Sequence, residues 1–270
     1  MTPDIRLVAV DIDGTFIHRD YTYDHKRFGR LFQAMKKTGC RFVAASGNQY
    51  AQLRDVFGEY ARDMAFVAEN GAYVRDLDTL VFASAMDLQV VRDVIETLDK
   101  DPAIQTVLCG VESAYCQRGK VDQAFYDLSS IYYHELRWVD DFRTVNDQIL
   151  KFTLTVSGEK TSEYCEWLRQ ELDGKVESTT SGHDSIDLIV PGCHKASGLK
   201  RLVERWDICP EQCAAFGDGG NDIEMLQYCG YSFAMANADE TVKKAAKAVC
   251  PSNEEDGVLV VLEQWFGEKP

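Results

Sequence analysis

Two acidic residues, Asp11 and Asp13, stand one residue apart and directly follow the apolar run Leu7-Val8-Ala9-Val10. Two carboxyl groups in so small a volume suit a nucleophile, a general acid/base and a site for a hard cation. The run before them has no polar alternation, which is typical of a strand buried on both faces of a parallel sheet. Because ligands bind outside the carboxyl ends of strands in open α/β sheets, Asp11 is predicted to lie at a functional site.

Three further groups of reactive residues stand where a strand ends or a helix begins. A hydroxyl and a glycine N–H follow the strand predicted at 41–45, and a lysine directly precedes a predicted helix. An acidic, glycine-rich segment follows the apolar strand predicted at 213–216. These groups are Ser46-Gly47, Lys195 and the cluster of Asp218, Asn221 and Asp222.

Together the four groups predict a site for phosphoryl transfer. Asp11 and Asp218 can share a Mg²⁺ ion, which prefers a few carboxylate oxygens, waters and a phosphate oxygen. The hydroxyl of Ser46, the N–H of Gly47 and the ammonium of Lys195 can bind the phosphate oxygens over which negative charge is spread. These groups supply the local positive charge that an acidic protein needs in order to bind an anion.

The two acids after the first strand have different predicted tasks. Asp11 is the nucleophile that attacks the phosphate, and the bound cation offsets the repulsion between the two anions. Asp13 protonates the leaving alkoxide and later deprotonates the water that hydrolyses the aspartyl phosphate. The residues therefore predict a two-step reaction through a covalent intermediate.

Each of these segments also has a structural alternative. Asp13-Gly14 is a strong hairpin-turn signal, and Ser46-Gly47 is compatible with an ordinary turn. Lys195 is equally typical of a solvated helix start. The segment 217–222 is compatible with a simple glycine-rich loop or a calcium-type acidic loop, although the further ligands and terminal Glu of an EF-hand are missing.

The pattern of elements predicts an α/β fold with an insertion. Strands alternate with helices in the first part of the chain, as in a parallel sheet covered by helices. From 84 to 187, pairs of strands are separated by helices, which predicts an inserted α+β domain. Alternation resumes after Pro191, so residues 1–83 and 188–270 are predicted to form one core domain.

Composition limits the class of protein. The 270 residues, 45% of them hydrophobic, can fill one large domain or two modest ones. A formal net charge of -15 would repel a nucleic-acid backbone or an anionic membrane, so neither is an expected partner. The sequence has no apolar run of membrane-spanning length and no signal-peptide pattern, which favours a cytoplasmic location. The nine scattered cysteines are expected to be reduced core residues, and the five histidines form no ligand cluster.

The combined motifs resemble the haloacid dehalogenase (HAD) superfamily of phosphatases. The first motif of that superfamily has the form D-x-D-G-T, which occurs here at 11–15. Within the superfamily the chain is most similar to the Cof-type branch (subclass IIB), and within this branch to bacterial sugar phosphatases. The resemblance extends over essentially the whole chain and rests further on the segments at 43–50, 68–72, 186–196, 216–222 and 232–238.

This resemblance implies a Rossmann-like parallel-sheet core and an inserted α+β cap of the C2B type that closes over the substrate. It implies a Mg²⁺ ion bound by the carboxylates of Asp11 and Asp218 and by the backbone carbonyl of Asp13. Asp222 would then support these ligands from behind. The implied phosphate-binding residues are Ser46, Gly47, Lys195 and Asn221.

The implied function is a Mg²⁺-dependent phosphatase that hydrolyses small sugar phosphates through an aspartyl phosphate. A sugar phosphotransferase that uses the same intermediate is one alternative. A non-catalytic regulator that binds sugar phosphates is another, although binding alone has no use for the acid/base Asp13. Many Cof-type members carry Arg at the position of Asn48, and its absence leaves more of the phosphate neutralisation to Lys195 and the metal.

Substrate choice is expected to fall to the inserted domain, because the core recognises only phosphate. Polar side chains of the insertion are candidates for contacts with sugar hydroxyls, although an ordinary solvated position is favoured for each. These candidates are Glu112, Tyr115, His183 and Asp184. The sequence leaves open which sugar phosphate is used and whether the protein is a monomer or a dimer.

Overall fold

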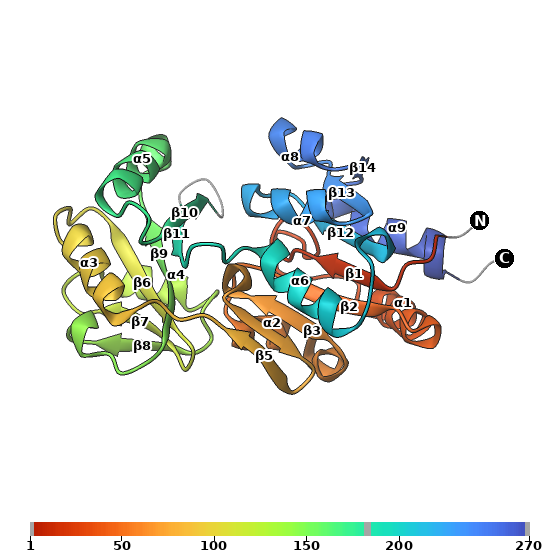
Figure 1. Ribbon diagram of the computed structural model, residues 1–270, viewed down its shortest axis with the longest axis horizontal. Coiled ribbons are helices and arrows are strands. Elements are labelled where there is room, and N and C mark those ends of the chain that lie inside the picture. The colour runs from red at the N-terminus through yellow and green to blue at the C-terminus, as the bar shows by residue number, and fades with distance from the viewer. Residues whose placement is uncertain (1–2, 181–184, 268–270) are drawn as a thin grey trace.

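The computed structural model describes residues 3–180 and 185–267. The chain forms two β-sheets with helices packed on them, and the inserted middle of the chain builds the smaller one (Figure 1). The larger sheet has eight strands in the order β14-β13-β12-β1-β2-β3-β4-β5. These strands are β1 (Leu7–Val10), β2 (Arg41–Ala45), β3 (Ala65–Ala68), β4 (Tyr73–Asp76), β5 (Thr79–Ala83), β12 (Cys213–Gly217), β13 (Tyr231–Met235) and β14 (Ala248–Cys250).

β1 lies inside this sheet between β2 and β12, and both pairings are parallel. Val10 lies opposite Ala44 on β2 and opposite Phe216 on β12. The carboxyl ends of the three strands therefore meet at one edge, which brings the loops that follow them together. β4 and β5 extend the sheet as antiparallel strands. The parallel pairing of β1 excludes the hairpin alternative for the turn at Gly14.

Helices cover both faces of the eight-stranded sheet, as the unbroken apolar run of β1 predicts. Val8 and Val10 pack into the core on one face, whereas Leu7 and Ala9 pack into the core on the other. The first face is covered by α1 (His25–Thr38), α2 (Tyr50–Phe57) and α9 (Gly257–Phe266). The second face is covered by α6 (Lys195–Arg205), α7 (Ile223–Tyr228) and α8 (Glu240–Ala245).

Helix α1 carries a cluster of aromatic rings that also holds the loop after β1. Asp24 caps the helix by accepting a hydrogen bond from the N–H of Arg27 over 2.9 Å, and Gly39 ends it with a φ of 75°. The ring of Phe28 lies 5.1–5.7 Å, centroid to centroid, from six other aromatic rings. One of these rings is Phe16, so packing on α1 fixes the segment that follows the two acids.

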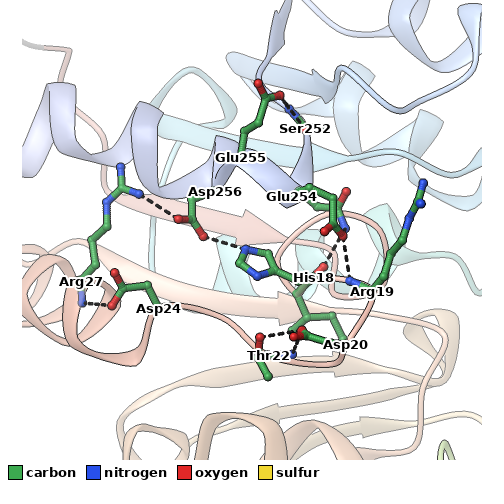
Figure 2. Close-up of polar contacts among 12 residues, drawn as sticks. His18, Arg19, Asp20, Thr22, Asp24, Arg27, Ser252, Glu254, Glu255 and Asp256 are labelled. Carbon is green, nitrogen blue, oxygen red and sulfur yellow. Dashed lines mark hydrogen bonds and ion pairs between the residues drawn. The ribbon is translucent and has the colours of Figure 1, made fainter.

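Polar contacts anchor the same loop to the C-terminal part of the chain. His18 Nε2 lies 2.9 Å from Asp256 Oδ1, and Arg27 donates from Nη1 to Asp256 Oδ2 over 3.1 Å (Figure 2). The backbone N–H of Arg19 donates to Glu254 Oε1 over 2.8 Å. These contacts tie the loop after β1 to the turn that precedes α9.

The smaller sheet has six strands in the order β10-β11-β9-β6-β7-β8, and its pairings are antiparallel except that of β7 with β8. Its strands are β6 (Gln105–Gly110), β7 (Ala114–Gln117), β8 (Leu136–Val139), β9 (Ile149–Thr155), β10 (Glu177–Thr180) and β11 (Ser185–Ile189). One face packs against α3 (Leu88–Leu98) and α5 (Thr161–Glu171), and the other against α4 (Gln123–Ser129).

Two elements, β8 and α8, have no counterpart in the sequence-based expectation. None of the four residues of β8 is buried, and α8 buries only Val242. With four and six residues, β8 and α8 are also too short to show a clear strand or helix period. In the ranges 3–180 and 185–267, no helix combines the length and apolarity that crossing a membrane requires.

The chain passes from the larger sheet to the smaller one after β5, which ends at Ala83. It returns after β11, which ends at Ile189. The bounds of the two domains, with 84–187 as the insertion, stay a prediction, and the second bound falls within β11.

Candidate active site

The loops after β1, β2 and β12 open into a cleft of about 690 Å³, which residues of the inserted domain line from the other side. The loops meet there because the carboxyl ends of parallel strands share one edge. Six residues predicted from the sequence to form a site line this cleft. They are Asp11, Asp13, Ser46, Gly47, Asp218 and Asn221.

Lys195 is the first residue of α6, and its side chain is 1% exposed. His194 caps the helix by accepting the N–H of Ser197 over 3.2 Å, which fixes the direction of the first turn. The ammonium lies 2.5 Å from Asp11 Oδ1 and 2.6 Å from Asp222 Oδ1. Burial alone would lower the pKa of Lys195, but the two carboxylates outweigh it and raise the pKa. Lys195 is therefore charged, and its ammonium contacts Asp11, which lines the cleft.

Three carboxylates are crowded beside this lysine. Asp11, Asp218 and Asp222 each place one oxygen within 4.8 Å of the other two. Burial, followed by repulsion from Asp222, raises the pKa of Asp11 well above its ordinary value, and burial raises the pKa of Asp218 to about 6. Thr15 opposes the second shift by donating from Oγ1 to Asp218 Oδ1 over 2.6 Å. This cluster could hold a metal ion, because a cation would stabilise its ionised form.

Both oxygens of Asp222 already have partners within the protein. Oδ1 pairs with Lys195, and Oδ2 accepts the N–H groups of Asp218 and Gly219 over 3.0 and 2.9 Å. Asp222 is fully buried, whereas Asp11 and Asp218 line the cleft. Asp222 therefore supports the loop after β12 and the lysine from behind.

Asp13 lies on the cleft wall beside Asp11 and has one defined partner. Asn48 donates from Nδ2 to Asp13 Oδ2 over 2.5 Å. Burial raises the pKa of Asp13, and the hydrogen bond from Asn48 opposes that shift. Burial therefore favours the protonated form, which can donate a proton, and the hydrogen bond favours the ionised form, which can accept one.

The loop after β2 presents Ser46 and Gly47 to the cleft. Ser46 is almost fully buried, and its Oγ accepts the N–H of Asn48 over 3.1 Å. A Cβ at Gly47 would lie 3.2 Å from the amide nitrogen of Asn70, so a larger side chain would crowd the loop. The same Asn70 side chain also contacts the loop after β12, because Asn221 donates from Nδ2 to Asn70 Oδ1 over 3.0 Å. The loop thus offers a hydroxyl and a close-packed N–H, which are groups that bind phosphate oxygens.

Four buried polar residues next to these loops are absent from the site residues predicted above. Lys151 on β9 and Asp187 on β11 come from the smaller sheet, and Glu69 and Asn70 follow β3. One sequence feature could have indicated them, namely a charged residue inside an apolar strand, such as Lys151 within Ile149–Thr155. Such residues are almost never fully buried unless they are paired, so a buried strand containing one indicates a partner elsewhere.

Two of the candidates in the inserted domain do not reach the cleft. Tyr115 packs with α3 and α5 and donates its hydroxyl to Asp147 Oδ2 over 3.0 Å, whereas Val107 on the opposite face lines the cleft. Glu112 is exposed in the turn after β6, and its N–H donates to the same carboxylate over 3.0 Å. Neither is placed to contact a sugar hydroxyl. The other two candidates, His183 and Asp184, lie outside the described residues.

A family model described as haloacid dehalogenase-like hydrolase matches residues 8–262, which include every loop of the cleft and both sheets apart from Leu7 of β1. The chain is a haloacid dehalogenase-like hydrolase. Its eight-stranded sheet is therefore the Rossmann-like core of that superfamily, and its six-stranded sheet belongs to the inserted cap.

Individual proteins similar to this hydrolase agree with the family assignment. The 5-amino-6-(5-phospho-D-ribitylamino)uracil phosphatase YbjI of Escherichia coli (strain K12) is 43% identical over 260 residues, which cover 96% of each chain. The crystal structure of SMU.1108c from Streptococcus mutans UA159 has a TM-score of 0.93 at 33% identity and covers 98% of this hydrolase and 100% of that chain. The HAD subclass IIB sugar phosphatase BT4131 has a TM-score of 0.79 at 22% identity, over 96% of this chain and 98% of that chain, which shows a shared fold.

These similarities confirm the resemblance to the Cof-type branch of the haloacid dehalogenase superfamily and the expected α/β core with an inserted cap. The hydrolase is a phosphoric monoester hydrolase. Its acidic cluster could hold a metal ion for this chemistry.

Proposed function

We propose that this hydrolase is a Mg²⁺-dependent phosphatase of phosphorylated sugars and sugar alcohols, with 5-amino-6-(5-phospho-D-ribitylamino)uracil as its leading substrate. The observation that carries the proposal is the carboxylate of Asp11, which lines the cleft beside Asp13 and pairs with Lys195. The substrate is supported by the relative at 43% identity, which is named for it and matches 96% of the chain. A ribityl phosphate is a phosphorylated sugar alcohol, so it is close to the class that the sequence motifs imply.

In this proposal, Mg²⁺ would be held by the carboxylates of Asp11 and Asp218 and by the backbone carbonyl of Asp13. Hard divalent cations prefer oxygen ligands, and the carboxylates of Asp11 and Asp218 in the acidic cluster offer them. The pKa values of Asp11 and Asp218 are raised because burial and neighbouring carboxylates disfavour their ionised forms. A bound cation would stabilise those ionised forms, which supports the assignment. When bound, Mg²⁺ supplies positive charge to the phosphate oxygens.

Asp11 acts as the nucleophile. One of its oxygens bonds to phosphorus as the bond between phosphorus and the ester oxygen breaks, which gives an aspartyl phosphate and an alkoxide. The ammonium of Lys195, 2.5 Å from Asp11 Oδ1, favours the ionised and therefore nucleophilic form of the carboxylate. The groups that bind the phosphate oxygens in this step are Ser46 Oγ, the Gly47 N–H, Lys195 Nζ and Asn221 Nδ2.

Asp13 handles the proton in both steps. In its protonated form it gives a proton to the leaving oxygen, and as a carboxylate it then takes a proton from water. The water oxygen bonds to phosphorus, the bond from phosphorus to Asp11 breaks, and inorganic phosphate leaves. The effect of burial on the pKa of Asp13 supports the first role, and the hydrogen bond from Asn48 supports the second.

The cap side of the cleft offers two kinds of surface to the leaving group. One surface carries hydroxyl side chains, among them Thr155 and Thr180. The other is mainly apolar and includes Phe125, Leu128 and Tyr132 on and after α4. The hydroxyls suit a ribityl chain and the apolar wall suits a planar uracil ring, and a volume of about 690 Å³ accommodates both.

Phosphate release tests the proposal directly. The panel contains phosphoribitylaminouracil, ribitol 5-phosphate, glucose 6-phosphate, a nucleotide and a phosphopeptide, each with Mg²⁺ or with EDTA. We expect the highest kcat/KM on phosphoribitylaminouracil, no release with EDTA, and no release by Asp11→Ala. Asp20→Ala, which changes an exposed acid of the same loop, serves as the matched control and should retain activity.

Two results would contradict this proposal. Wild-type rates in Asp11→Ala would rule out the covalent route. A higher kcat/KM on the nucleotide or the phosphopeptide would rule out the substrate class. Addition of free ribitol, with analysis of the products, distinguishes hydrolysis from phosphotransfer through the same intermediate.

A further inference from the structure

One buried lysine of the cap reaches the phosphate-binding loop of the core. Lys151 lies on β9, and its side chain is 2% exposed. Its ammonium donates to the carbonyl oxygen of Gly47 over 2.5 Å, and it lies 3.2 Å from Asp187 Oδ2 and 3.3 Å from Glu69 Oε2. Lys151 and Asp187 belong to the cap sheet, whereas Gly47 and Glu69 belong to loops of the core. One ammonium therefore joins the two domains beside the cleft, whose wall it shares.

The arrangement keeps Lys151 charged. Burial of an ammonium is unfavourable because water is removed from the charge, unless carboxylates compensate for that loss. Burial lowers the pKa of Lys151, but Asp187 and the other groups around it outweigh burial and raise the pKa well above its ordinary value. The group that contacts the Gly47 carbonyl is therefore a charged ammonium, with Asp187 and Glu69 as its counter-ions.

A chain of hydrogen bonds leads from this charge to the hydroxyl of Ser46. The carbonyl of Gly47, which accepts from Lys151, forms one peptide unit with the N–H of Asn48. That N–H donates to Ser46 Oγ over 3.1 Å. A cation on the carbonyl polarises the peptide unit and strengthens its N–H as a donor. Because Ser46 Oγ accepts this hydrogen bond, its own hydrogen does not point toward Asn48. Ser46 lines the cleft, so its hydroxyl is free to donate to a group bound there.

We propose that Lys151 is a positioning residue for phosphoryl transfer, which acts from the cap by orienting and polarising the loop from Ser46 to Asn48. The proposal rests on the proposed function for the identity of the bound group, a phosphate. Lys151 itself does not need to touch the substrate. It orients the Ser46 hydroxyl toward the phosphate. Its hydrogen bond to the Gly47 carbonyl also fixes the backbone conformation of Gly47, whose N–H is proposed to bind the phosphate.

A second set of contacts holds Lys151 in place. Asp187 accepts hydrogen bonds from Asn70 Nδ2 over 2.6 Å and from Thr153 Oγ1 over 2.7 Å. Asn70 in turn accepts from Asn221 Nδ2 over 3.0 Å. The network therefore extends from the cap to the loop after β12. Docking of the cap on the core thus orders two loops that are proposed to bind phosphate, the loop after β2 and the loop after β12.

This role has a consequence that separates Lys151 from an ordinary cap residue. A cap side chain that touches the leaving group affects some substrates more than others. Lys151 contacts the phosphate-binding loop instead, so its loss should affect every phosphate ester by a similar factor. Binding of the phosphate group alone should weaken as well.

The experiment compares Lys151→Met, Lys151→Gln and the exposed-cap control Lys175→Met in the full-length enzyme with Mg²⁺. Two esters with unrelated leaving groups, phosphoribitylaminouracil and p-nitrophenyl phosphate, are assayed for kcat and KM. Binding of inorganic phosphate is measured separately by calorimetry, which does not depend on turnover. Circular dichroism and thermal unfolding check the fold of each variant. A double variant, Lys151→Met with Asp187→Asn, removes the buried charges of Lys151 and Asp187 together and replaces any single variant that fails to fold.

We expect Lys151→Met to lower kcat/KM by about tenfold or more on both esters. Outright removal of an oxyanion donor costs about 10²–10³ in kcat, and a misoriented Ser46 hydroxyl loses part of that contribution. Phosphate affinity should fall as well, and Lys175→Met should match the wild type. Lys151→Gln, which keeps a donor but no charge, should lie between Lys151→Met and the wild type. Unchanged phosphate affinity, or a loss confined to one ester, would overturn the proposal.

Failure of the proposed function gives a different result. If the wild type does not hydrolyse phosphoribitylaminouracil, the proposed substrate is wrong. The role of Lys151 is then still decided by p-nitrophenyl phosphate and by the calorimetry.

Discussion

Asn48 donates a hydrogen bond from Nδ2 to Oδ2 of Asp13 over 2.5 Å, and this contact joins the loop after β2 to the loop after β1. The bond favours the ionised form of Asp13, so its loss should raise the pKa of that carboxyl. The step that takes a proton from water needs ionised Asp13. In Asn48→Ala, the acid limb of the pH–rate profile should therefore move to higher pH.

The size of this effect follows from the type of bond. Hydrogen bonds to charged groups contribute about 1.5–3 kcal/mol, so turnover on the acid side should fall about tenfold or more. The measurement is kcat across the pH range for Asn48→Ala and for Asn146→Ala, an exposed asparagine of the cap. An acid limb that stays in place in Asn48→Ala would show that Asp13 does not limit that step.

Asp13→Ala should separate the two chemical steps. With p-nitrophenyl phosphate, the leaving group departs without needing a proton, so Asp11 can still be phosphorylated. The loss of the base should slow hydrolysis of the intermediate by about 10²–10⁴-fold. A burst of nitrophenolate, followed by slow turnover and a phosphoprotein seen by intact-protein mass spectrometry, is the expected result. Undiminished steady-state turnover would remove Asp13 from the acid/base role.

Thr15→Val should weaken metal binding. Valine has nearly the same volume as threonine but lacks the hydroxyl. Thr15 donates to Asp218 Oδ1 over 2.6 Å, so it orients a proposed ligand. Loss of such an orienting hydrogen bond costs about 10–100-fold in metal affinity. Calorimetric titration with Mg²⁺ measures the change, and Thr22→Val, whose hydroxyl pairs with Asp20 in the same loop, is the matched control. Equal affinities for the two variants would contradict the prediction.

Phe28→Ala should destabilise the core domain strongly. Phe28 is fully buried at the centre of the aromatic cluster on α1. Truncation of a buried Phe to Ala costs about 3–5 kcal/mol in the free energy of unfolding, because it leaves a cavity. Urea unfolding measures the loss. Leu88→Ala, at a position that is 66% exposed, should change the free energy by less than about 0.5 kcal/mol, and equal losses in both variants would argue against the cavity explanation.

The sequence by itself determined which residues meet at the carboxyl edge of the core sheet. Asp11, Ser46 and Asp218 each follow closely on an apolar strand, and the alternation of strands with helices requires those strands to be parallel. Parallel strands end at a common edge, so local patterns were sufficient to bring the three loops together. The same patterns set the burial of β1 on both faces.

Only the tertiary structure decided which side chains of the cap reach that edge. Lys151 and Gly47 are 104 positions apart, and their contact depends on how the cap sheet docks on the core. Within the cap, Tyr115 packs on the face that holds α3 and α5, because residues of a strand alternate between its two faces. A sequence pattern shows that a charged residue interrupts an apolar strand. The partner that allows its burial comes from a distant segment, and docking of the two domains brings them together.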